Sequence, residues 1–199
     1  FSADNYLQQP YNSDLDFGTG DFCIMGWFKH SDTASNEIFR RADPAFSGAY
    51  FRLYQSSTGI VARTSGRILT STISVNSGSW RQVTVVRRNG ILELWLDGAL
   101  NVSGADTSDL TNTSATFCLG NRQDGADAYA NGSLALWRIS GTAPTAEQIK
   151  KIYEDEKVLF QDGAQATLYG SSDAVTALAY DDTTDILHVG TSAGRSDFS

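Results

Sequence analysis

The chain of 199 residues has only two cysteines, two histidines and three prolines, and it has no long run of hydrophobic residues. A membrane-spanning helix needs about 20 consecutive apolar residues, so we expect no membrane insertion. No signal peptide is recognisable, and the chain does not begin with methionine. We therefore expect it to be a piece of a longer polypeptide.

The two histidines, His30 and His188, do not lie in contexts typical of a Ser-His-Asp set. The cysteines, Cys23 and Cys118, are far apart in the apolar runs DFCIMGWF and ATFCLGN. Metal-binding cysteines usually come in closely spaced pairs. We interpret both as buried free thiols, and a disulfide across the fold is the alternative.

Positive charge is also scarce, because the net charge is -8 and lysine and arginine form no cluster in the sequence. A nucleic-acid partner would need a basic surface, so we expect none. The acidity favours solubility and supplies carboxylates that could bind a hard cation.

Short strand-like runs separated by Gly, Ser, Asn or Asp dominate the chain to about residue 140. With 41% hydrophobic residues and 18 glycines, this pattern predicts an all-β antiparallel sandwich of two sheets. The runs occupy residues 4–10, 21–30, 36–43, 49–57, 59–65, 68–75, 79–100, 115–121 and 132–140.

Residues 79–100, SWRQVTVVRRNGILELWLDGAL, predict a hairpin around Asn89-Gly90, a pair suited to a two-residue turn. The expected register pairs Val85 with Leu94 and Val83 with Leu96 on an apolar face. The same register brings polar and aromatic residues to a second, mixed face. Its pairs are Thr84 with Trp95, Val86 with Glu93 and Gln82 with Asp97.

Residues 143–157 predict one short helix. Thr145 and Gln148 form a capping-box pattern, and an apolar stripe follows at helical spacing, formed by Ala146, Ile149, Ile152 and Tyr153. We interpret the acidic residues 154–156 as a solvated helix end. Beyond residue 157 the pattern predicts three strands and two turns, which we assign to a separate small β extension at 158–199.

Four pieces in this order resemble laminin-G-like domains of the concanavalin A-like lectin/glucanase superfamily: FSADNYLQQP, LDFGTGDFCIMGWFKH, SWRQVTVVRRNGILELWLDGAL and LGNRQDGADAYANGSLALWRISGTAPTAEQIKKIY. The resemblance implies a jelly roll over residues 1–157.

The segment AVTALAYDDTTDILHVGTSAGRSDF is similar to one blade segment of a β-propeller. Together they resemble bacteriophage tail-fibre or other virion proteins. This implies a location on the virion surface or outside the cell.

The sequence argues against catalysis. Glucanases of this superfamily carry Glu-x-Asp-x-x-Glu on one strand face, and this chain lacks it. Glu93 and Asp97 are the nearest candidates, yet four residues of strand separate their carboxylates by about 13 Å. Retaining glycosidases need about 5–5.5 Å. We interpret Asp97 as part of the Asp-Gly turn.

Members of the superfamily often bind Ca²⁺ in loops, and GNRQDGADAYANG resembles the calcium loop of pentraxins. The resemblance implies oxygen ligands from Gln123, Asp124, Asp127 and Asn131. Two departures weigh against the site. Arg122 stands where the pentraxin loop has an acidic residue, and Ala135-Leu136 stands where many laminin-G-like domains have an acidic pair. The alternative is that these Asp and Asn residues serve the turn itself.

Sugar sites pair an aromatic plate with hydrogen-bonding side chains. The mixed face of the hairpin offers such a set, and the alternative is that its tryptophans are structural. The candidate ligand-binding residues are Trp27, Gln82, Thr84, Glu93 and Trp95.

We therefore expect a non-enzymatic adhesion or receptor-binding module that contacts cell-surface glycan or a host receptor. The alternative is a structural spacer or decoration module with protein contacts only, and a glycan-degrading enzyme is disfavoured. Because a lone blade-like segment cannot bury its own face, we expect a homo-oligomer, with a trimer favoured.

Overall fold

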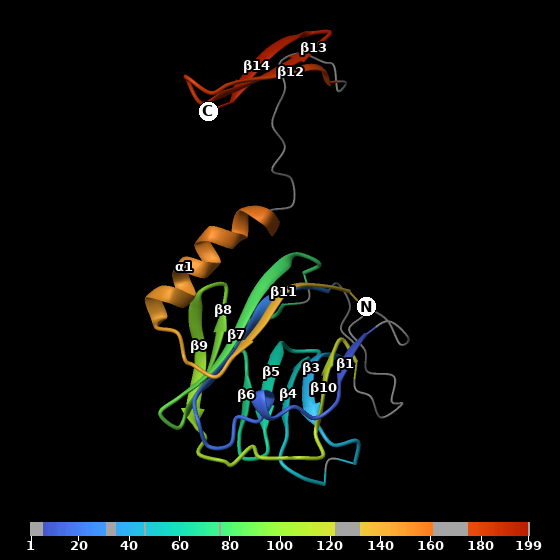
Figure 1. Cartoon of the computed structure of the whole chain (residues 1–199), viewed down its shortest axis with the longest axis vertical. Coiled ribbons are helices and arrows are strands. Elements are labelled where there is room, and N and C mark those ends of the chain that lie inside the picture. Colours follow the sequence, from blue (N-terminus) through green and yellow to red (C-terminus); the bar gives the residue numbers. More distant parts are fainter. Residues whose placement is uncertain are drawn as a thin grey trace. The chain divides into compact units, whose positions relative to one another are not determined.

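The computed structural model describes residues 6–30, 35–45, 47–75, 77–121, 132–160 and 175–198. It divides the chain into two compact units, Phe1–Asp162 and Gly163–Ser199. The first unit contains two large sheets and a helix, and the second contains a small sheet (Figure 1).

One large sheet has six strands in the order β1-β10-β3-β4-β5-β6, and every neighbouring pair is antiparallel. The strands are β1 (Leu7–Gln9), β3 (Asn36–Ala42), β4 (Phe51–Gln55), β5 (Ile60–Thr64), β6 (Ile68–Thr70) and β10 (Thr116–Leu119). A short 3₁₀ helix, η1 (Ser13–Leu15), follows β1.

The other large sheet has five strands in the order β11-β2-β7-β8-β9, also antiparallel. They are β2 (Phe22–Lys29), β7 (Trp80–Arg88), β8 (Ile91–Leu96), β9 (Ala99–Ala105) and β11 (Ser133–Ser140). The core lies between the two sheets, because their inward residues form one buried cluster that includes Phe22, Phe51 and Leu94. The jelly-roll sandwich predicted from the sequence is confirmed.

The hairpin has the predicted register, since Val83 pairs with Leu96, Thr84 with Trp95, Val85 with Leu94 and Val86 with Glu93. Asn89 and Gly90 have φ of 50° and 74°, as a two-residue turn of this kind requires. Register and turn agree because the alternating pattern and the Asn-Gly pair favour the same pairing.

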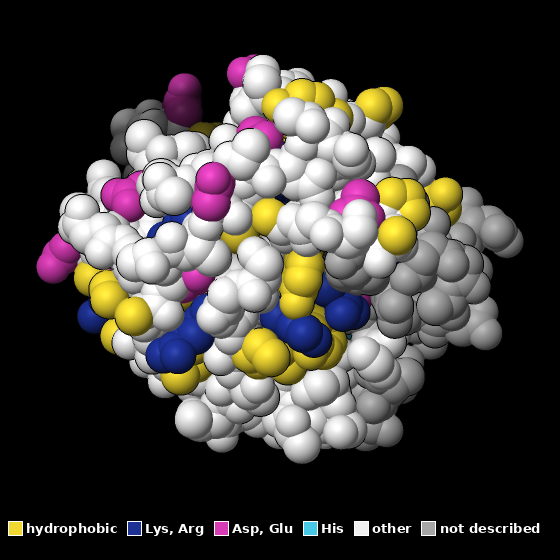
Figure 2. Space-filling view, turned by 90° about the horizontal axis from the view of Figure 1, so that it is seen from below, with side chains coloured by type: hydrophobic (Ala, Val, Ile, Leu, Met, Phe, Trp, Pro, Cys, Tyr) yellow, Lys and Arg dark blue, Asp and Glu magenta, His cyan; other side chains and the backbone are white. Residues whose placement is uncertain are grey.

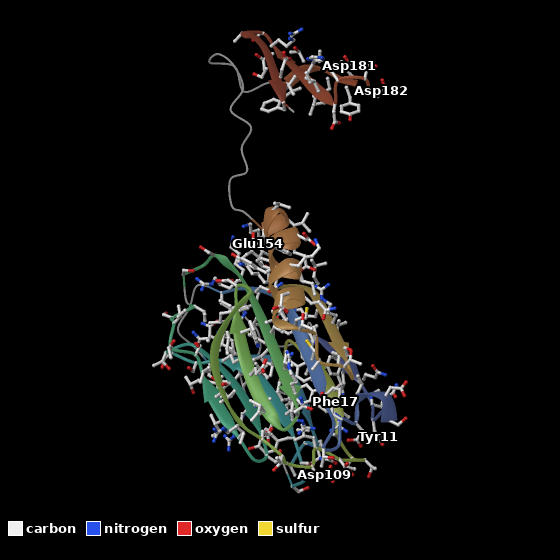
Figure 3. All side chains as sticks on the ribbon, turned by 90° about the vertical axis from the view of Figure 1, so that its left-hand side faces the viewer. Tyr11, Phe17, Asp109, Glu154, Asp181 and Asp182 are labelled. Atoms are coloured by element: carbon white, nitrogen blue, oxygen red, sulfur yellow. The ribbon has the colours of Figure 1, made fainter. Side chains whose placement is uncertain are left out.

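Helix α1 (Ala146–Glu156) begins with the predicted capping box: Gln148 N donates to Thr145 Oγ1, and Thr145 N donates to Gln148 Oε1. Its fully buried Ile149 packs against Cys23, Met25, Val86 and Trp95. The helix therefore covers the outer face of the five-stranded sheet (Figure 3). A 3₁₀ helix, η2 (Lys157–Phe160), continues from it.

Two buried charged side chains hold the loops at one end of the sandwich. Arg87 is fully buried and donates to the carbonyl oxygens of Gly18, Gly20 and Ser108 at 2.6–2.8 Å. Asp43 accepts from the backbone N–H groups of residues 45, 47 and 48 at 2.9–3.0 Å. These donors, with the Ser47 N–H foremost, hold the pKa of the Asp43 carboxyl well below its usual range.

Both cysteines are free and buried, which confirms the interpretation as thiols. Burial raises the pKa of the Cys23 thiol to about 12 and that of the Cys118 thiol to about 11. In the part of the chain that the structure describes, no helix combines the length and the apolar character needed to span a membrane.

The second unit is an antiparallel three-stranded sheet of β12 (Val175–Asp181), β13 (Ile186–Thr191) and β14 (Gly194–Phe198). The pairing places Leu178 opposite Val189 and Tyr180 opposite Leu187, so one face is apolar. His188 and Asp197 pair on the other face, where their side chains are 2.7 Å apart. Leu178 and Tyr180 are 66% and 60% exposed.

Candidate functional site: two outer faces of the sandwich

The structure brings the five candidate sugar-binding residues together. Strand alternation directs them away from the core, to the outer face of the five-stranded sheet, because their neighbours Val83, Val85 and Leu94 point inward. We call this surface the tryptophan face, and it comprises Trp27, Gln82, Thr84, Glu93 and Trp95.

Helix α1 and η2 cover the tryptophan face, so both indole rings are buried. Trp27 is 2% exposed and Trp95 is 7% exposed. The Trp27 ring stacks between the rings of Tyr153 and Phe160, with centroids 5.8 and 4.2 Å away. The Trp95 Nε1 donates to Glu93 Oε2 at 2.9 Å. In this arrangement the tryptophans pack the helix against the sheet.

Glu156, at the end of α1, connects the helix to the sheet. Its Oε2 accepts from Trp27 Nε1 at 2.7 Å and lies 3.5 Å from Gln82 Nε2, and its Oε1 pairs with Arg138 of β11. The side chain is 15% exposed. The interpretation of residues 154–156 as a solvated helix end is therefore wrong for Glu156, because the helix turns this carboxylate toward the sheet. It holds for Glu154 and Asp155, which are 45% and 58% exposed.

Sugar could reach the tryptophan face only if α1 moved away from the sheet. That these five residues contact a ligand therefore remains a prediction. In the described arrangement Trp27, Gln82, Glu93 and Trp95 already have aromatic or hydrogen-bonding partners within the protein.

The two carboxylates considered for catalysis each have an arginine partner. Asp97 pairs with Arg81 at 2.7 Å, and Glu93 lies 3.6 Å from Arg88. Burial raises the pKa of Asp97 above its ordinary value. Asp97 and Gly98 have φ of 49° and 74°, which confirms the interpretation of this pair as a turn.

The predicted calcium ligands Gln123, Asp124, Asp127 and Asn131 lie outside the described residues. Among the residues that are described, no group of three or more His, Cys, Asp or Glu side chains could hold a metal ion.

The six-stranded sheet carries a row of arginines on its own outer face. Arg40, Arg52 and Arg63 are directly opposite one another across β3, β4 and β5. The Arg52 guanidinium binds Glu37 through two hydrogen bonds of 2.9 and 2.6 Å and lies 4.6 Å from the centre of the Tyr54 ring. We call this surface the arginine face, and it comprises Glu37, Arg40, Arg52, Tyr54 and Arg63.

Exposure increases along the row, from buried Arg40 to partly exposed Arg63. Beyond Arg63 lies a hollow of about 340 Å³, lined by Tyr50, Arg63, Thr64, Ser65, Gly66, Arg67 and Ile68. Seen from below, the molecule shows Lys and Arg side chains lying among hydrophobic ones (Figure 2). On the arginine face Glu37 and Arg40 are buried, whereas Tyr54 and Arg63 are partly exposed.

Sequence reasoning missed the arginine face. The runs NEIFRRAD, AYFRLYQSS and GIVARTS each contain an arginine that alternates with apolar residues. That signal is visible strand by strand, but only the cross-strand register aligns the arginines in one row.

A family model of the concanavalin A-like lectin/glucanases superfamily matches residues 1–150. The chain belongs to this superfamily. A search of curated proteins found no match.

Several solved structures have a similar fold. The binding domain of botulinum neurotoxin serotype D in complex with N-acetylneuraminic acid is 14% identical, with a TM-score of 0.63 over 94% of this chain and 51% of that chain. Domain 4 of AbnA, an extracellular arabinanase from Geobacillus stearothermophilus, in complex with arabinotriose, is 17% identical, with a TM-score of 0.58 over 74% and 72%.

A heptameric SAP-like pentraxin from Limulus polyphemus is 16% identical, with a TM-score of 0.53 over 67% of this chain and 69% of that chain. At these identities the likeness shows the fold alone. The chain spans about half the length of the toxin binding domain.

Proposed function

We propose that the chain is a non-enzymatic glycan-binding module that acts in adhesion or receptor binding. The observation that carries the proposal is the contrast between its two outer faces. Helix α1 and η2 bury the tryptophan face, whereas Tyr54 and Arg63 of the arginine face are partly exposed and a hollow adjoins Arg63. Aromatic surface combined with a few polar groups is what sugar sites use.

Two further observations support binding rather than hydrolysis. Two of the similar structures contain a carbohydrate, arabinotriose in one and N-acetylneuraminic acid in the other. Each of the carboxylates considered for catalysis lies beside an arginine.

The test is a glycan array followed by titration of the best ligand. We expect Tyr50→Ala to weaken binding, because it removes a ring beside the hollow, and Trp95→Phe to leave it unchanged. Loss of binding in Trp95→Phe with Tyr50→Ala unaffected would place the site on the tryptophan face instead. Release of reducing sugar from the bound glycan would contradict a non-enzymatic role.

The second candidate is an assembly role for the small sheet, favoured by its apolar face. Exposed Leu178 and Tyr180 would be buried in a homo-oligomer, with a trimer as the favoured state. Multivalent display would strengthen weak glycan contacts and suits a virion fibre, such as a phage tail fibre, or another extracellular protein as the parent.

Light scattering of the full chain and of Leu178→Lys tests this role. An oligomer that dissociates in the variant supports assembly, and monomers in both contradict it. A chain that assembles and binds no glycan would be a structural spacer.

A further inference from the structure

A hollow lies between helix α1 and the end of strand β11, on the outer side of the five-stranded sheet. Its inner part has a volume of about 140 Å³, and Cys23, Met25 and Ile152 are among the residues that line it. Its outer part has a volume of about 450 Å³. The two parts share Thr142, Pro144 and Ile152, so they adjoin, and we call them together the helix groove.

The residues of the helix groove come together from three elements. Four residues of α1 recur at helical spacing and form one stripe: Gln148, Lys151, Ile152 and Asp155. Strand β11 pairs with β2, where Arg138 is opposite Met25 and Ser140 is opposite Cys23. Cys23 and Met25 pack in the buried cluster beneath α1, so all four of these strand residues share the outer side of the sheet.

The segment between β11 and α1 is held in place by hydrogen bonds. A guanidinium N–H of Arg88, on β7, donates to the carbonyl oxygen of Pro144. Thr142 N donates to Ser140 Oγ at 3.1 Å, and the hydroxyl oxygens of the same two residues are 2.7 Å apart. The helix groove is therefore formed before a ligand arrives, which lowers the cost of binding.

The inner part of the helix groove is apolar. Cys23 and Met25 are 3% and 4% exposed, and thiol and thioether side chains of this kind behave as soft apolar surface. Burial raises the pKa of the Cys23 thiol to about 12, so this thiol is uncharged at neutral pH. Further out, Thr142 and Gln148 supply a hydroxyl and an amide group.

The charged groups of the helix groove are balanced. Lys151 Nζ lies 2.8 Å from Asp155 Oδ2, and the Arg138 guanidinium pairs with Glu156. Both cations that line the groove thus have a carboxylate of α1 beside them, and a charged ligand would compete with an existing ion pair. A neutral ligand with one apolar end and several hydroxyl groups fits this combination.

We propose that the helix groove binds a neutral sugar that carries a methyl group, as in a deoxy sugar or an N-acetylated hexose. The methyl group enters the inner part, against Cys23, Met25 and Ile152, and the ring hydroxyls bind Thr142 and Gln148 in the outer part. The outer volume is within the range of small-molecule sites. This inference goes beyond the proposed function, because the groove and the arginine face belong to different sheets.

The chain offers a direct reporter, because Met25 is its only methionine. A methyl-labelled methionine therefore gives one NMR signal from the inner part of the groove. The full chain is titrated with L-fucose and L-galactose, which differ by a methyl in place of a hydroxymethyl group, and with N-acetylglucosamine and glucose. We expect L-fucose and N-acetylglucosamine to shift the Met25 signal with about fourfold or more higher affinity than their partners, the factor for burying one methyl group.

Three variants locate the site. Thr142→Trp should abolish the ligand-induced shift, because an indole ring would fill the outer part. Lys150→Trp is the matched control, since Lys150 is exposed and lies on the other side of α1 from the stripe that lines the groove. Cys23→Ser should remove the preference for L-fucose over L-galactose, because a hydroxyl makes the inner part polar. Circular dichroism checks that each variant is folded.

The outcomes separate this inference from the proposed function. Equal affinities within each sugar pair, or a shift that persists in Thr142→Trp, overturn it. A Met25 signal that no sugar shifts also overturns it, and a shift caused instead by a capped leucine peptide would make the groove a protein-docking site. Glycan binding that Tyr50→Ala weakens, with the Met25 response unchanged, supports two separate sites. A Met25 response without any ligand on the glycan array supports this groove and contradicts the arginine face.

Discussion

Replacing Glu156 tests whether the residues of the tryptophan face serve to pack α1 against the sheet or to bind a ligand. In Glu156→Ala, Trp27 Nε1 loses an acceptor at 2.7 Å, and Arg138 loses its partner. A hydrogen bond to a charged group contributes about 1.5–3 kcal/mol. The pair with Arg138, whose side chain is 45% exposed, adds at most about 0.5 kcal/mol. The expected loss in the free energy of unfolding is therefore about 2–3 kcal/mol.

For a unit of this size that loss lowers the Tm by about 5–10 °C. Calorimetry or denaturation with urea measures it, and tryptophan fluorescence reports the environment of Trp27. Glu154→Ala is the matched control on the same helix, because Glu154, labelled in Figure 3, is 45% exposed and pairs with Lys157. Its Tm should stay within about 2 °C of the unchanged chain. If Glu156→Ala and the control have equal Tm values, the contact between Glu156 and Trp27 does not stabilise the fold.

The same variant also tests the tryptophan face as a binding surface. If glycans quench tryptophan fluorescence in Glu156→Ala but not in the unchanged chain, the loosened helix has exposed a latent sugar site. If quenching is absent in both, the two tryptophans serve packing.

Three further predictions concern buried groups. The pKa of Asp43 lies below its ordinary value, so the ionised carboxylate stabilises the fold above the pKa of Asp in the unfolded chain, and this stabilisation is lost as the pH falls. We therefore expect Asp43→Asn to flatten the decline in Tm between about pH 5 and pH 2. An unchanged slope of Tm against pH would contradict this. Arg87→Met should lower the free energy of unfolding by more than about 3 kcal/mol, because three carbonyl acceptors lose their donor. A loss below about 1 kcal/mol in urea denaturation would show that water replaces the guanidinium as the donor. With pKa values of about 12 and 11, Cys23 and Cys118 should not react with a disulfide reagent at about pH 8 until the chain is denatured, and rapid labelling of the native chain would disprove their burial.

Local patterns account for what was predicted correctly. Asn89-Gly90 and the alternating residues beside it favour one register, and Thr145 and Gln148 satisfy each other's backbone groups within a single turn of helix. Strand β9 was missed beyond residue 100. Its sequence, ALNVSGA, contains Asn, Ser and Gly, and it forms a strand because β8 offers an unpaired edge.

The tryptophan face and the arginine face could not be predicted in this way, because they depend on contacts between segments far apart in the chain. The sequence around Trp27 and Trp95 is that of a sugar site whether these side chains are exposed or buried. They are buried because α1 packs against them. The arginine face depends in the same way on the register of three strands.

The sequence by itself determined the all-β class, the hairpin register, the helix start and the superfamily, because periodicity, turn residues and caps act over a few residues. Tertiary structure alone decided which outer face α1 covers and which arginines pair with a carboxylate. Those properties arise when side chains distant in sequence compete for the same partner. Glu156 binds Trp27 across 129 positions of chain, while the buried Nε of Arg63 has no acceptor among the described residues.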